Sequence, residues 1–465
     1  MYKKERNHIL KIFYDMAKLI KEFIGIIVAV GVLVNKIGIV RSVLIGVVLA
    51  AAVILYEFLL WRKNFFAVGE NFIYHQEGVF NVKKVEIPFE RIDTIDISQR
   101  LAERIFKVAT IKIDTGDTSN RGSELKFTLK KTRAEQLRDI LLKRSAVDSK
   151  VQEERSYTVK PRELIIYSLV SNSVLKGLGM LLVAQQFFDQ YLKNFIPVDT
   201  SLYVDELRKE DIYHAIYTVS LLVLALLFIS VFLSIIYVLL KYYDFKVWSD
   251  GDKIYIKYGA VNKKNYSFDR EKIKGIHVKQ SILMQLFGFF TMEIESIGYG
   301  DEKEEKAILY PMCTHSLKDQ IIEGMLCEFK YSGNTVKPYN SAGFRFFYKK
   351  VIFWAAVALV CFFIKPRFVI FTLVLLLFLL IMGYFEFRNT AFGIDRNLIY
   401  MSYHGFNKTQ SILKMTAVQS LTLSYSYFQH KKGFCDYSII LYSSNAGKVL
   451  KVKNLKDDII GEAFK

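Results

Sequence analysis

The sequence predicts an α+β membrane protein in which six transmembrane helices, arranged as three hairpins, alternate with three small domains of antiparallel sheet. Three observations predict this fold class. Long apolar blocks recur along the chain, a pattern of about forty residues occurs three times between them, and each copy of the pattern is followed by a helix-start signal. Each domain is therefore expected to end with a C-terminal capping helix.

The repeated stretch runs over Phe72–Thr110, again over Ile254–Thr291 and, more loosely, over Leu398–Asp436. In each copy a glycine ends a strand-like run, three aliphatic residues follow at fixed steps, and a glutamine or tyrosine comes next. These positions are Gly78, Ile92, Ile95, Ile97 and Gln99; Gly259, Ile273, Ile276, Val278 and Gln280; and Gly405, Val418, Leu421, Leu423 and Tyr425. Alternating apolar residues around them predict half-buried strands.

A capping residue followed three positions later by an acid closes each copy: Thr132 with Glu135, Ser316 with Asp319, and Asn454 with Asp457. This spacing is typical of a capping box, which satisfies free N–H groups at a helix start. Apolar residues then recur at helical spacing. Each repeat is therefore predicted to be a set of strands followed by one amphipathic helix.

Composition favours a membrane protein over a nucleic-acid-binding protein. The chain of 465 residues is 52% hydrophobic and carries a formal net charge of +18. Such a charge attracts either phosphate backbones or anionic lipids. Its basic pairs stand beside the apolar blocks, as at Arg62–Lys63 and Lys349–Lys350, which indicates a membrane and no nucleic acid. The four cysteines show no CxxC spacing, which indicates a reducing compartment without structural disulfides or a zinc site.

The apolar blocks and repeats divide the chain into six predicted segments. These are an amphipathic lead-in and first hairpin at 1–63, a first domain at 64–160, a second hairpin at 161–240, a second domain at 241–345, a third hairpin at 346–384 and a third domain at 385–465. The lead-in, Ile9–Phe23, has helical spacing that suits either an interfacial helix or the approach to the first span.

Loop charge predicts the orientation of this hairpin arrangement. The loop 185–213 is acidic, whereas basic residues flank the other ends of the spans. Basic flanks stay on the cytoplasmic side of a membrane. We therefore expect a multi-pass protein of the bacterial cell membrane whose termini and three folded domains are cytoplasmic. The basic turn Lys365–Arg367 is an exception to this rule.

An apolar hairpin followed by the Gly78-to-Gln99 unit, three times over, resembles the YdbT-type membrane proteins of bacteria. These proteins carry bacterial pleckstrin-homology-like (PH-like) domains of the second family. The most specific stretches are Gly78–Phe80 through Ile87–Ile92 to Ser98–Gln99, and Gly259 through Lys279–Ser281 to Leu286–Gly288. The resemblance implies a strongly bent antiparallel sheet closed at one end by the capped helix. It implies no enzymatic reaction, and fold alone does not determine function.

Basic residues of the first two domains form a candidate patch for anionic head groups: Lys263, Lys264, Arg270, Lys272, Lys274 and Lys279 in the second domain, and Lys83, Lys84 and Arg91 in the first. A solvated face is the competing interpretation. The chain shows no Walker, dinucleotide, HExxH or Cys/His pattern. We therefore expect no catalytic residues, no metal and no cofactor.

The function expected from these features is that of a non-enzymatic membrane platform, whose three cytoplasmic PH-like domains bind lipid head groups or a partner membrane protein. Membrane lipids and a smaller membrane protein with a similar PH-like domain are the candidate partners. The alternative is a transport-related protein that moves or shields lipids through the six-helix bundle. Asn172 and Lys176, polar residues in the third predicted span, support that alternative.

Overall fold

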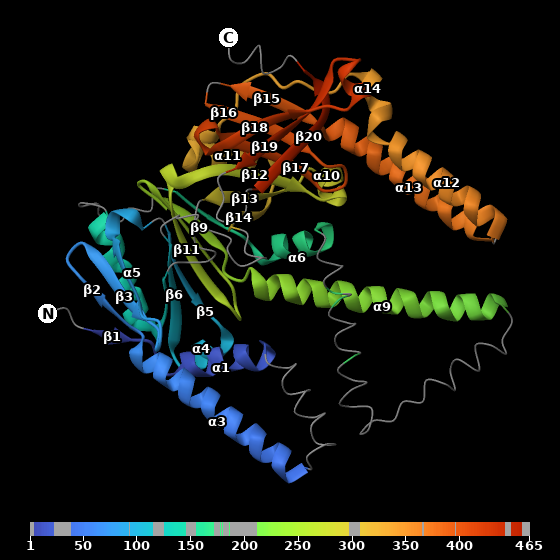
Figure 1. Ribbon diagram of the computed structural model, residues 1–465. Helices are drawn as coiled ribbons and strands as arrows, with labels where there is room; N and C mark the ends of the chain where they lie inside the picture. The colour runs from blue at the N-terminus through green and yellow to red at the C-terminus, as the bar shows by residue number, and fades with distance from the viewer. Residues whose placement is uncertain are drawn as a thin grey trace. The chain divides into compact units, whose positions relative to one another are not determined.

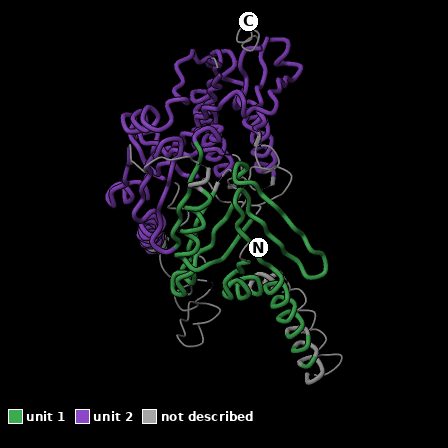
Figure 2. The backbone as a smooth tube through the Cα atoms, turned by 90° about the vertical axis from the view of Figure 1, so that its left-hand side faces the viewer, with its two compact units in different colours: residues 1–152, 262–269, 298–303 green, residues 153–261, 270–297, 304–465 purple. Residues whose placement is uncertain are grey.

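The computed structural model describes residues 4–22, 39–92, 94–114, 125–145, 155–171, 212–296, 307–364, 367–395, 397–441 and 448–457, with positions 177, 179 and 186. Figure 1 shows the helices and strands of the chain, and Figure 2 shows the two compact units into which it divides. Unit 1 comprises residues 1–152, 262–269 and 298–303, and unit 2 comprises residues 153–261, 270–297 and 304–465.

Unit 1 contains the N-terminal helices, the first repeat and one strand of the second repeat. Its helices are α1 (Leu10–Glu22), α3 (Ile39–Lys63), α4 (Leu101–Ile105) and α5 (Lys131–Ser145), with the 3-10 turn η1 (Phe89–Arg91). Its strands are β1 (Glu5–Arg6), β2 (Phe65–Val68), β3 (Phe72–Glu77), β4 (Lys83–Pro88), β5 (Thr94–Gln99), β6 (Val108–Asp114), β7 (Leu125–Lys130) and β11 (Lys263–Asp269). They form two antiparallel sheets, ordered β1-β2-β3-β4 and β7-β6-β5-β11.

Unit 2 contains the rest of the second repeat, the third repeat and the apolar helices beside them. Its helices are α6 (Pro161–Val170), α9 (Ile212–Lys241), α10 (Ile282–Phe287), α11 (His315–Met325), α12 (Tyr348–Ile364), α13 (Arg367–Asn389) and α14 (Tyr427–His430). Its 3-10 turns are η3 (Arg270–Lys272), η4 (Cys327–Phe329), η5 (Asn340–Phe346) and η6 (Met415–Ala417).

The strands of unit 2 are β8 (Arg155–Thr158), β9 (Lys246–Asp250), β10 (Lys253–Tyr258), β12 (Ile273–Gln280), β13 (Phe290–Ser296), β14 (Ala307–Cys313), β15 (Ala391–Asp395), β16 (Leu398–Tyr403), β17 (Lys408–Lys414), β18 (Val418–Ser424), β19 (Phe434–Leu441) and β20 (Lys448–Lys456). They form antiparallel sheets ordered β10-β9-β8, β14-β13-β12-β17-β16-β15 and β18-β19-β20. The predicted mixture of helices with several antiparallel sheets is confirmed.

Alternating residues along the strands build the cores. In β6, Ile111 and Ile113 are fully buried, and the ring of Phe127 in β7 stacks on Phe66 in β2 with a centroid distance of 4.3 Å. Helix α5 covers this core with the buried side chains of Leu137 and Leu141. Burying each such side chain stabilises the fold by roughly 1.5–3 kcal/mol. The predicted apolar face of this helix is the face that packs on the sheet.

Consecutive repeats share sheets, which the sequence pattern did not predict. Strand β11 of the second repeat pairs with β5 of the first, and β17 of the third repeat pairs with β12 of the second. Each sheet that joins two repeats therefore takes its strands from both. The repeats are interleaved, and none of these joined sheets belongs to a single repeat.

The repeated residues hold turns and strand ends in place. Gly78 and Gly259 adopt φ values of 104° and 109°, a region that favours glycine. Gln99 donates from Nε2 to the backbone oxygen of Val108 at 2.6 Å, and Gln280 donates to the backbone oxygen of Phe289 at 2.9 Å. In the third repeat the positive φ, 68°, falls on His404, one residue before Gly405.

The predicted capping residues lie inside the helices of the first two repeats, which begin earlier, and the third predicted capping residue lies in a strand. Helix α5 begins at Lys131, so Thr132 already lies inside it. The capping residue of α11 is Thr314, whose hydroxyl accepts from the backbone N–H of Leu317, and Ser316 lies inside the helix. Asn454 lies in strand β20 with a φ of 56°, because the strand continues through Lys456. Residues 458–465, where a third capping helix was predicted, lie outside the described residues.

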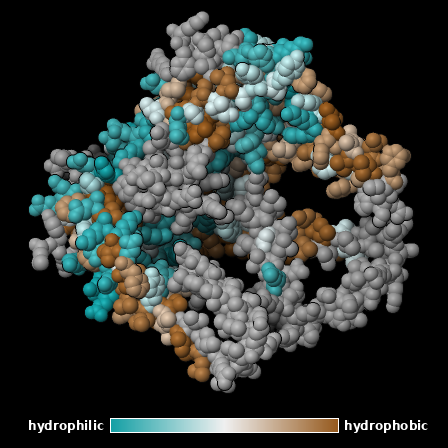
Figure 3. Space-filling model, viewed as in Figure 1, coloured by the Kyte–Doolittle hydropathy of each residue, from teal (hydrophilic) through white to brown (hydrophobic). Residues whose placement is uncertain are grey.

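Three helices in the described part of the chain are long and apolar enough to cross a membrane, whereas six were predicted. Their apolar stretches are Val223–Lys241 in α9, Asn340–Phe363 around α12, and Val369–Asn389 in α13. Figure 3 shows the hydrophobic residues that cover the α12–α13 arm. The predicted span Val43–Trp61 falls within α3, and α6 covers only the first residues of Leu164–Ala184. The run Phe23–Val34 lies outside the described residues.

Candidate functional site

Each repeat carries a short helix directly after its fourth strand: α4 after β5, α10 after β12 and α14 after β18. A surface helix in a soluble domain normally turns its apolar residues inward and its polar residues outward. Each of these three short helices differs from that arrangement. One polar residue of each helix is held against the domain by hydrogen bonds, and most of the large apolar residues are exposed, with Met284 of α10 as a buried exception.

The inward residues are Glu103, Gln285 and Gln429. The carboxylate of Glu103 is 2% exposed and accepts from the Thr110 hydroxyl at 2.8 Å. The amide of Gln285 donates to the backbone oxygens of Gly405 and Phe406 at 3.2 and 3.1 Å. The amide of Gln429 donates to Asp436 and Asn454. Because these bonds occupy the inner face of each helix, the apolar face is left outside.

The outward residues are large and hydrophobic in all three repeats. Leu286 is 74% exposed, Ile105 is 72% exposed and Tyr427 is 77% exposed. The complete set is Leu101, Ile105 and Phe106; Ile282, Leu283, Leu286 and Phe287; and Tyr425, Tyr427 and Phe428. Exposed apolar clusters of this kind mark contact with a partner or with lipid.

A cavity of about 760 Å³ lies beside α10 in unit 2, and we call it the membrane-proximal pocket. Its wall joins the ends of apolar helices to the ends of the inner strands β12, β13 and β17. It is lined by Tyr167, Ser171, Lys279, Gln280, Ser281, Met284, Thr291, Glu293, Lys350, Met382, Glu386, His404, Gly405, Phe406, Asn407, Thr409 and Lys453. Lys350 comes from the first turn of α12 and Glu386 from the last turns of α13.

Three lysines and two glutamates set the charge of this pocket. Glu386 accepts from Lys453 at 2.9 Å and from Lys350 at 3.4 Å, and Lys279 forms an ion pair with Glu293. These five charges leave one positive charge in excess. The glutamate side chains are 13% and 11% exposed, whereas Lys453 is 49% exposed. The lysines therefore face solvent more than their partners do.

His404 adds no charge at neutral pH. Partial burial is the largest cause that lowers its pKa, and the ammonium groups of Lys453 and Lys279 lower it further, while Glu386 opposes them. The ring lies against Tyr403 with a centroid distance of 4.7 Å. The lysines and glutamates alone therefore determine the net charge of the pocket at neutral pH.

Hydrogen bonds fix the turn that forms one side of the pocket. Besides Gln285, the amide of Asn389 at the end of α13 donates to the backbone oxygen of Gly405 at 3.0 Å. Asn389 also donates to the side-chain oxygen of Gln285 at 3.1 Å. The ring of Phe406 packs on Phe378 of α13 with a centroid distance of 5.0 Å. The apolar and charged walls are thus held together at the foot of the α12–α13 hairpin.

This arrangement can bind a group that is both charged and apolar. Lysine ammonium groups bind phosphate oxygens, and hydroxyls such as Thr409 and Ser171 offer further hydrogen bonds. Met284, Met382 and Phe406 supply an apolar wall. A phospholipid head group with the first carbons of its chains has this combination of properties.

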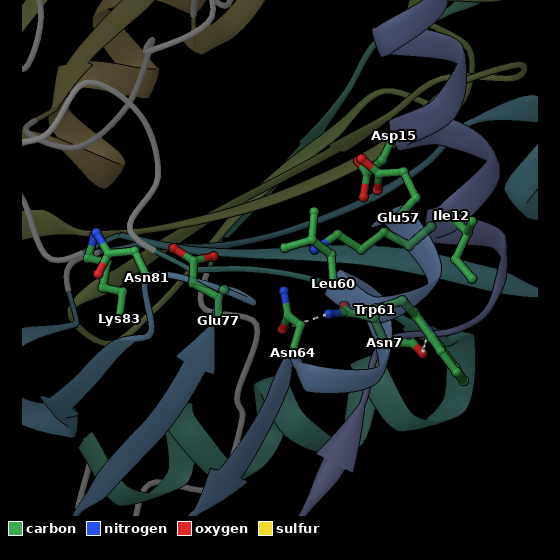
Figure 4. A pocket seen from close by; sticks show the side chains of 12 residues that line it. Asn7, Ile12, Asp15, Glu57, Leu60, Trp61, Asn64, Glu77, Asn81 and Lys83 are labelled. Carbon is green, nitrogen blue, oxygen red and sulfur yellow. Dashed lines mark hydrogen bonds between the residues drawn. The ribbon is translucent and has the colours of Figure 1, made fainter. Parts of the chain in front are cut away.

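Unit 1 has a smaller cavity of about 320 Å³ between α1, α3 and the β3–β4 turn, shown in Figure 4. Asp15 and Glu57 lie close together at one end, and Glu77 and Lys83 lie at the other. The indole N–H of Trp61 donates to the backbone oxygen of Asn7 at 2.8 Å. This bond ties the N-terminal segment to α3, which indicates a structural role.

The residues of the predicted basic patch are divided between the two compact units. Lys83, Lys84, Arg91, Lys263 and Lys264 belong to unit 1, and Arg270, Lys272, Lys274 and Lys279 belong to unit 2. Lys272 ends the turn η3, so it does not share a strand with Lys274. Of the patch residues in unit 2, Lys279 lines the membrane-proximal pocket. The patch as a head-group site stays a prediction.

Sequence reasoning missed Lys350, Glu386, His404 and Lys453. The pair Lys349–Lys350 was interpreted only as a topology signal, and no sequence motif links these positions. Their sequence separation is large, so only the packing of α12, α13 and β20 brings them together. Asn172 and Lys176, on which the transport alternative depends, lie outside the described residues. In the part of the chain that the structure describes, no group of three or more His, Cys, Asp or Glu side chains is placed to hold a metal ion.

Comparison with known proteins gives three findings. The profile of the family described as "Bacterial PH domain" matches residues 23–145, 200–318 and 351–457. The chain is 25% identical over 420 residues to the UPF0699 transmembrane protein YdbT of Bacillus subtilis (strain 168), covering 86% of this chain and 83% of that protein. No solved structure matches the chain.

Proposed function

The chain belongs to the bacterial PH domain family, and from this premise we propose that it is a membrane-anchored platform that binds lipid head groups at the bilayer surface. The protein is a membrane protein with three repeated bacterial PH domains. The proposed platform is non-enzymatic. Its six spans form three hairpins, and its termini and PH-like domains lie on the cytoplasmic side.

The membrane-proximal pocket is the observation that carries this proposal. It places three lysines and an apolar wall at the foot of the α12–α13 hairpin, where a bound lipid would keep its chains among apolar side chains. The outward apolar residues of α10 lie beside it. In this proposal α10 rests in the bilayer surface and the pocket receives the phosphate of an adjacent lipid.

Binding proceeds by exchange of ion-pair partners. Lys453 contacts Oε1 and Lys350 contacts Oε2 of Glu386, so two ammonium groups share one negative charge. A phosphate group can satisfy one of them without leaving Glu386 unpaired. Each lysine near an anionic lipid surface contributes about 1 kcal/mol, which corresponds to about a fivefold change in affinity.

The test is lipid retention by the purified chain. Lys453→Ala is expected to reduce about fivefold the binding of phosphatidylglycerol, measured by native mass spectrometry after extraction in mild detergent. Lys451→Ala is the matched control, because Lys451 lies two residues away on the same strand and pairs with Asp436 at 3.1 Å without lining the pocket. Equal retention by the two variants would contradict the pocket as the lipid site.

A further inference from the structure

The joint between consecutive repeats has the same form at both places where it occurs. The third strand of a repeat is β4, β11 or β17, and the fourth strand is β5, β12 or β18. The third strand of the following repeat pairs with the fourth strand of the preceding one. Lys263 lies opposite Gln99 in one joint, and Lys408 lies opposite Gln280 in the other. Lys263 and Lys408 stand at the same distance before the turns η3 and η6, so the two joints have the same register.

Two strands of the right kind are outermost in their sheets, as far as the structure describes the chain. Strand β4, the third strand of the first repeat, is the outermost strand of its sheet among the described residues. Strand β18, the fourth strand of the third repeat, is outermost in the described part of its sheet as well. The chain thus carries, in β4 and β18, the two kinds of strand that pair with each other in its two internal joints.

The edge of β18 lacks charges and prolines, two of the usual protections against pairing. Its sequence, Val-Gln-Ser-Leu-Thr-Leu-Ser, contains neither, and Thr422, Leu423 and Ser424 are exposed. Bulges also shield open edges, and the register of β18 against β19 shifts only between Val418 and Ser420, at the start of the strand. The segment from Leu421 to Ser424 keeps a regular register, and such an edge pairs readily with another strand.

The lysines of β4 do not argue against pairing. Lysine also begins the third strands that are paired, since Lys263 begins β11 and Lys408 begins β17. Pro88 stands at the last position of β4, where a missing N–H disturbs a sheet least. Strand β4 therefore has the features of a third strand that is ready to pair.

We propose that β4 of one copy of this chain pairs antiparallel with β18 of a second copy and forms the same joint between molecules. Val82 lies the same number of residues before the turn η1 as Lys263 lies before η3. Tyr425 occupies the position in the third repeat that Gln99 occupies in the first. Transfer of the internal register therefore places Val82 opposite Tyr425 and Lys84 opposite Leu423. The contact is heterologous, so it joins copies head to tail.

The side chains that this register brings together suit one another. Val82 and Tyr425 are 42% and 59% exposed in the single chain, and each would cover the other. The aliphatic stem of Lys84 would lie on Leu423, which is 39% exposed, while its ammonium group stays in water. A polar residue opposite an aliphatic one also occurs in both internal joints, where Asn265 faces Ile97 and Gln410 faces Val278.

Disulfide trapping between two differently tagged chains tests this joint. Lys84→Cys is introduced in one chain and Leu423→Cys in the other, with Cys327→Ser and Cys361→Ser in both, and mild oxidant is added to membranes that contain the two. The expected result is a covalent dimer that carries both tags. Lys83→Cys with Ser424→Cys repeats the test at two further exposed positions that the register places opposite each other.

Two controls define the outcome. Asn265→Cys with Ile97→Cys in one chain, the equivalent pair of an internal joint, is expected to form a disulfide without a gain in mass. Lys84→Cys with Thr422→Cys is expected to crosslink about tenfold less, because one residue of slippage turns the side chain to the other face.

Three results would overturn the proposal. The first is the absence of a mixed dimer while the internal control forms its disulfide. The second is a link from the Lys84→Cys chain to a different protein. The third is a link that forms only when Lys84→Cys and Leu423→Cys are carried by the same chain.

Discussion

At the scale of single residues, the residues that recur in the repeats stabilise turns and strand ends. Gln99 and Gln280 use their side chains to bind a backbone oxygen after the short helix. Lys107 and Gly288 occupy equivalent positions with positive φ values of 52° and 70°. The resemblance between repeats therefore reports backbone geometry, and a shared ligand is not needed to explain it.

Two glycines predict different costs of substitution. Gly78→Ala is expected to destabilise unit 1 by about 2 kcal/mol or more, because the added methyl group would collide with the backbone oxygen of Asn81 at a positive φ. Gly288→Ala is expected to cost only about 1 kcal/mol, because open space surrounds its position. Thermal unfolding of both variants in the same detergent measures the difference. Equal melting temperatures would show that the turn at Gly78 is not constrained.

We expect the folded chain to lose stability in acid because of His75. Its side chain is 5% exposed, its Nε2 lies 3.0 Å from the side-chain oxygen of Asn64, and burial is the largest cause that lowers its pKa. Glu77 raises this pKa, while Lys11 and Lys83 lower it. The unfolded chain therefore binds a proton more readily than the folded chain, and stability falls as pH decreases below the ordinary histidine range.

The measurement is the change in melting temperature of the intact chain between pH 7.5 and pH 5.5. His75→Gln is expected to reduce this change, because glutamine cannot take up a proton. His430→Gln is the control, since His430 is exposed at the end of α14. An unchanged pH dependence in His75→Gln would exclude His75 as a cause of acid sensitivity.

At the scale of elements, the three short helices carry most of their large apolar residues on the outside. Their amphipathic pattern was available in the sequence, but the direction of the apolar face was not. Hydrogen bonds accepted by Glu103 and donated by Gln285 and Gln429 decide that direction, because a buried polar group needs a partner. The apolar face is then left outward, where lipid can cover it.

A tryptophan placed on α10 tests contact with the bilayer. In a chain whose three native tryptophans are replaced by phenylalanine, Leu286→Trp is expected to show blue-shifted emission that brominated phospholipids quench in reconstituted vesicles. Val449→Trp on β20 is the comparison, because Val449 is also exposed, at 58%, but lies on a strand. Similar quenching at the two sites, or water-like emission from both, would place α10 away from lipid.

Element boundaries show what local spacing can decide. The apolar periodicity of Leu137 and Leu141 predicted the buried face of α5 correctly, because helix geometry fixes which side chains share a face. The capping pattern missed the helix start at Thr132 and Ser316 and failed at Asn454. Helix α5 begins at Lys131, and Thr314 takes the capping role of α11. Asn454 lies at an irregularity in the pairing of β20 with β19, where its backbone N–H donates to the Asp436 carboxylate.

At the scale of the whole molecule, the repeats are not independent structural units, because consecutive repeats share sheets. A sheet completed by a strand of the next repeat links the folding of the two repeats, since neither half has its full set of hydrogen bonds alone. The same rule leaves β4 and β18 incomplete at the two ends of the series. Head-to-tail pairing between copies follows from this regularity and needs no contact of a new type.

The sequence by itself determined that the protein is a membrane protein with repeated units of strands, because apolar length and the spacing of strand residues are local properties that survive in any arrangement. The PH-like character of these units was implied by the resemblance to the YdbT-type family. Only the tertiary structure decided which strands pair across repeats and which distant side chains form the pocket. The third strand of each repeat offers the same backbone hydrogen bonds, so local sequence cannot determine which strand it pairs with. Lys279, Lys350, Glu386 and Lys453 meet only because helix and sheet packing brings their elements to one place.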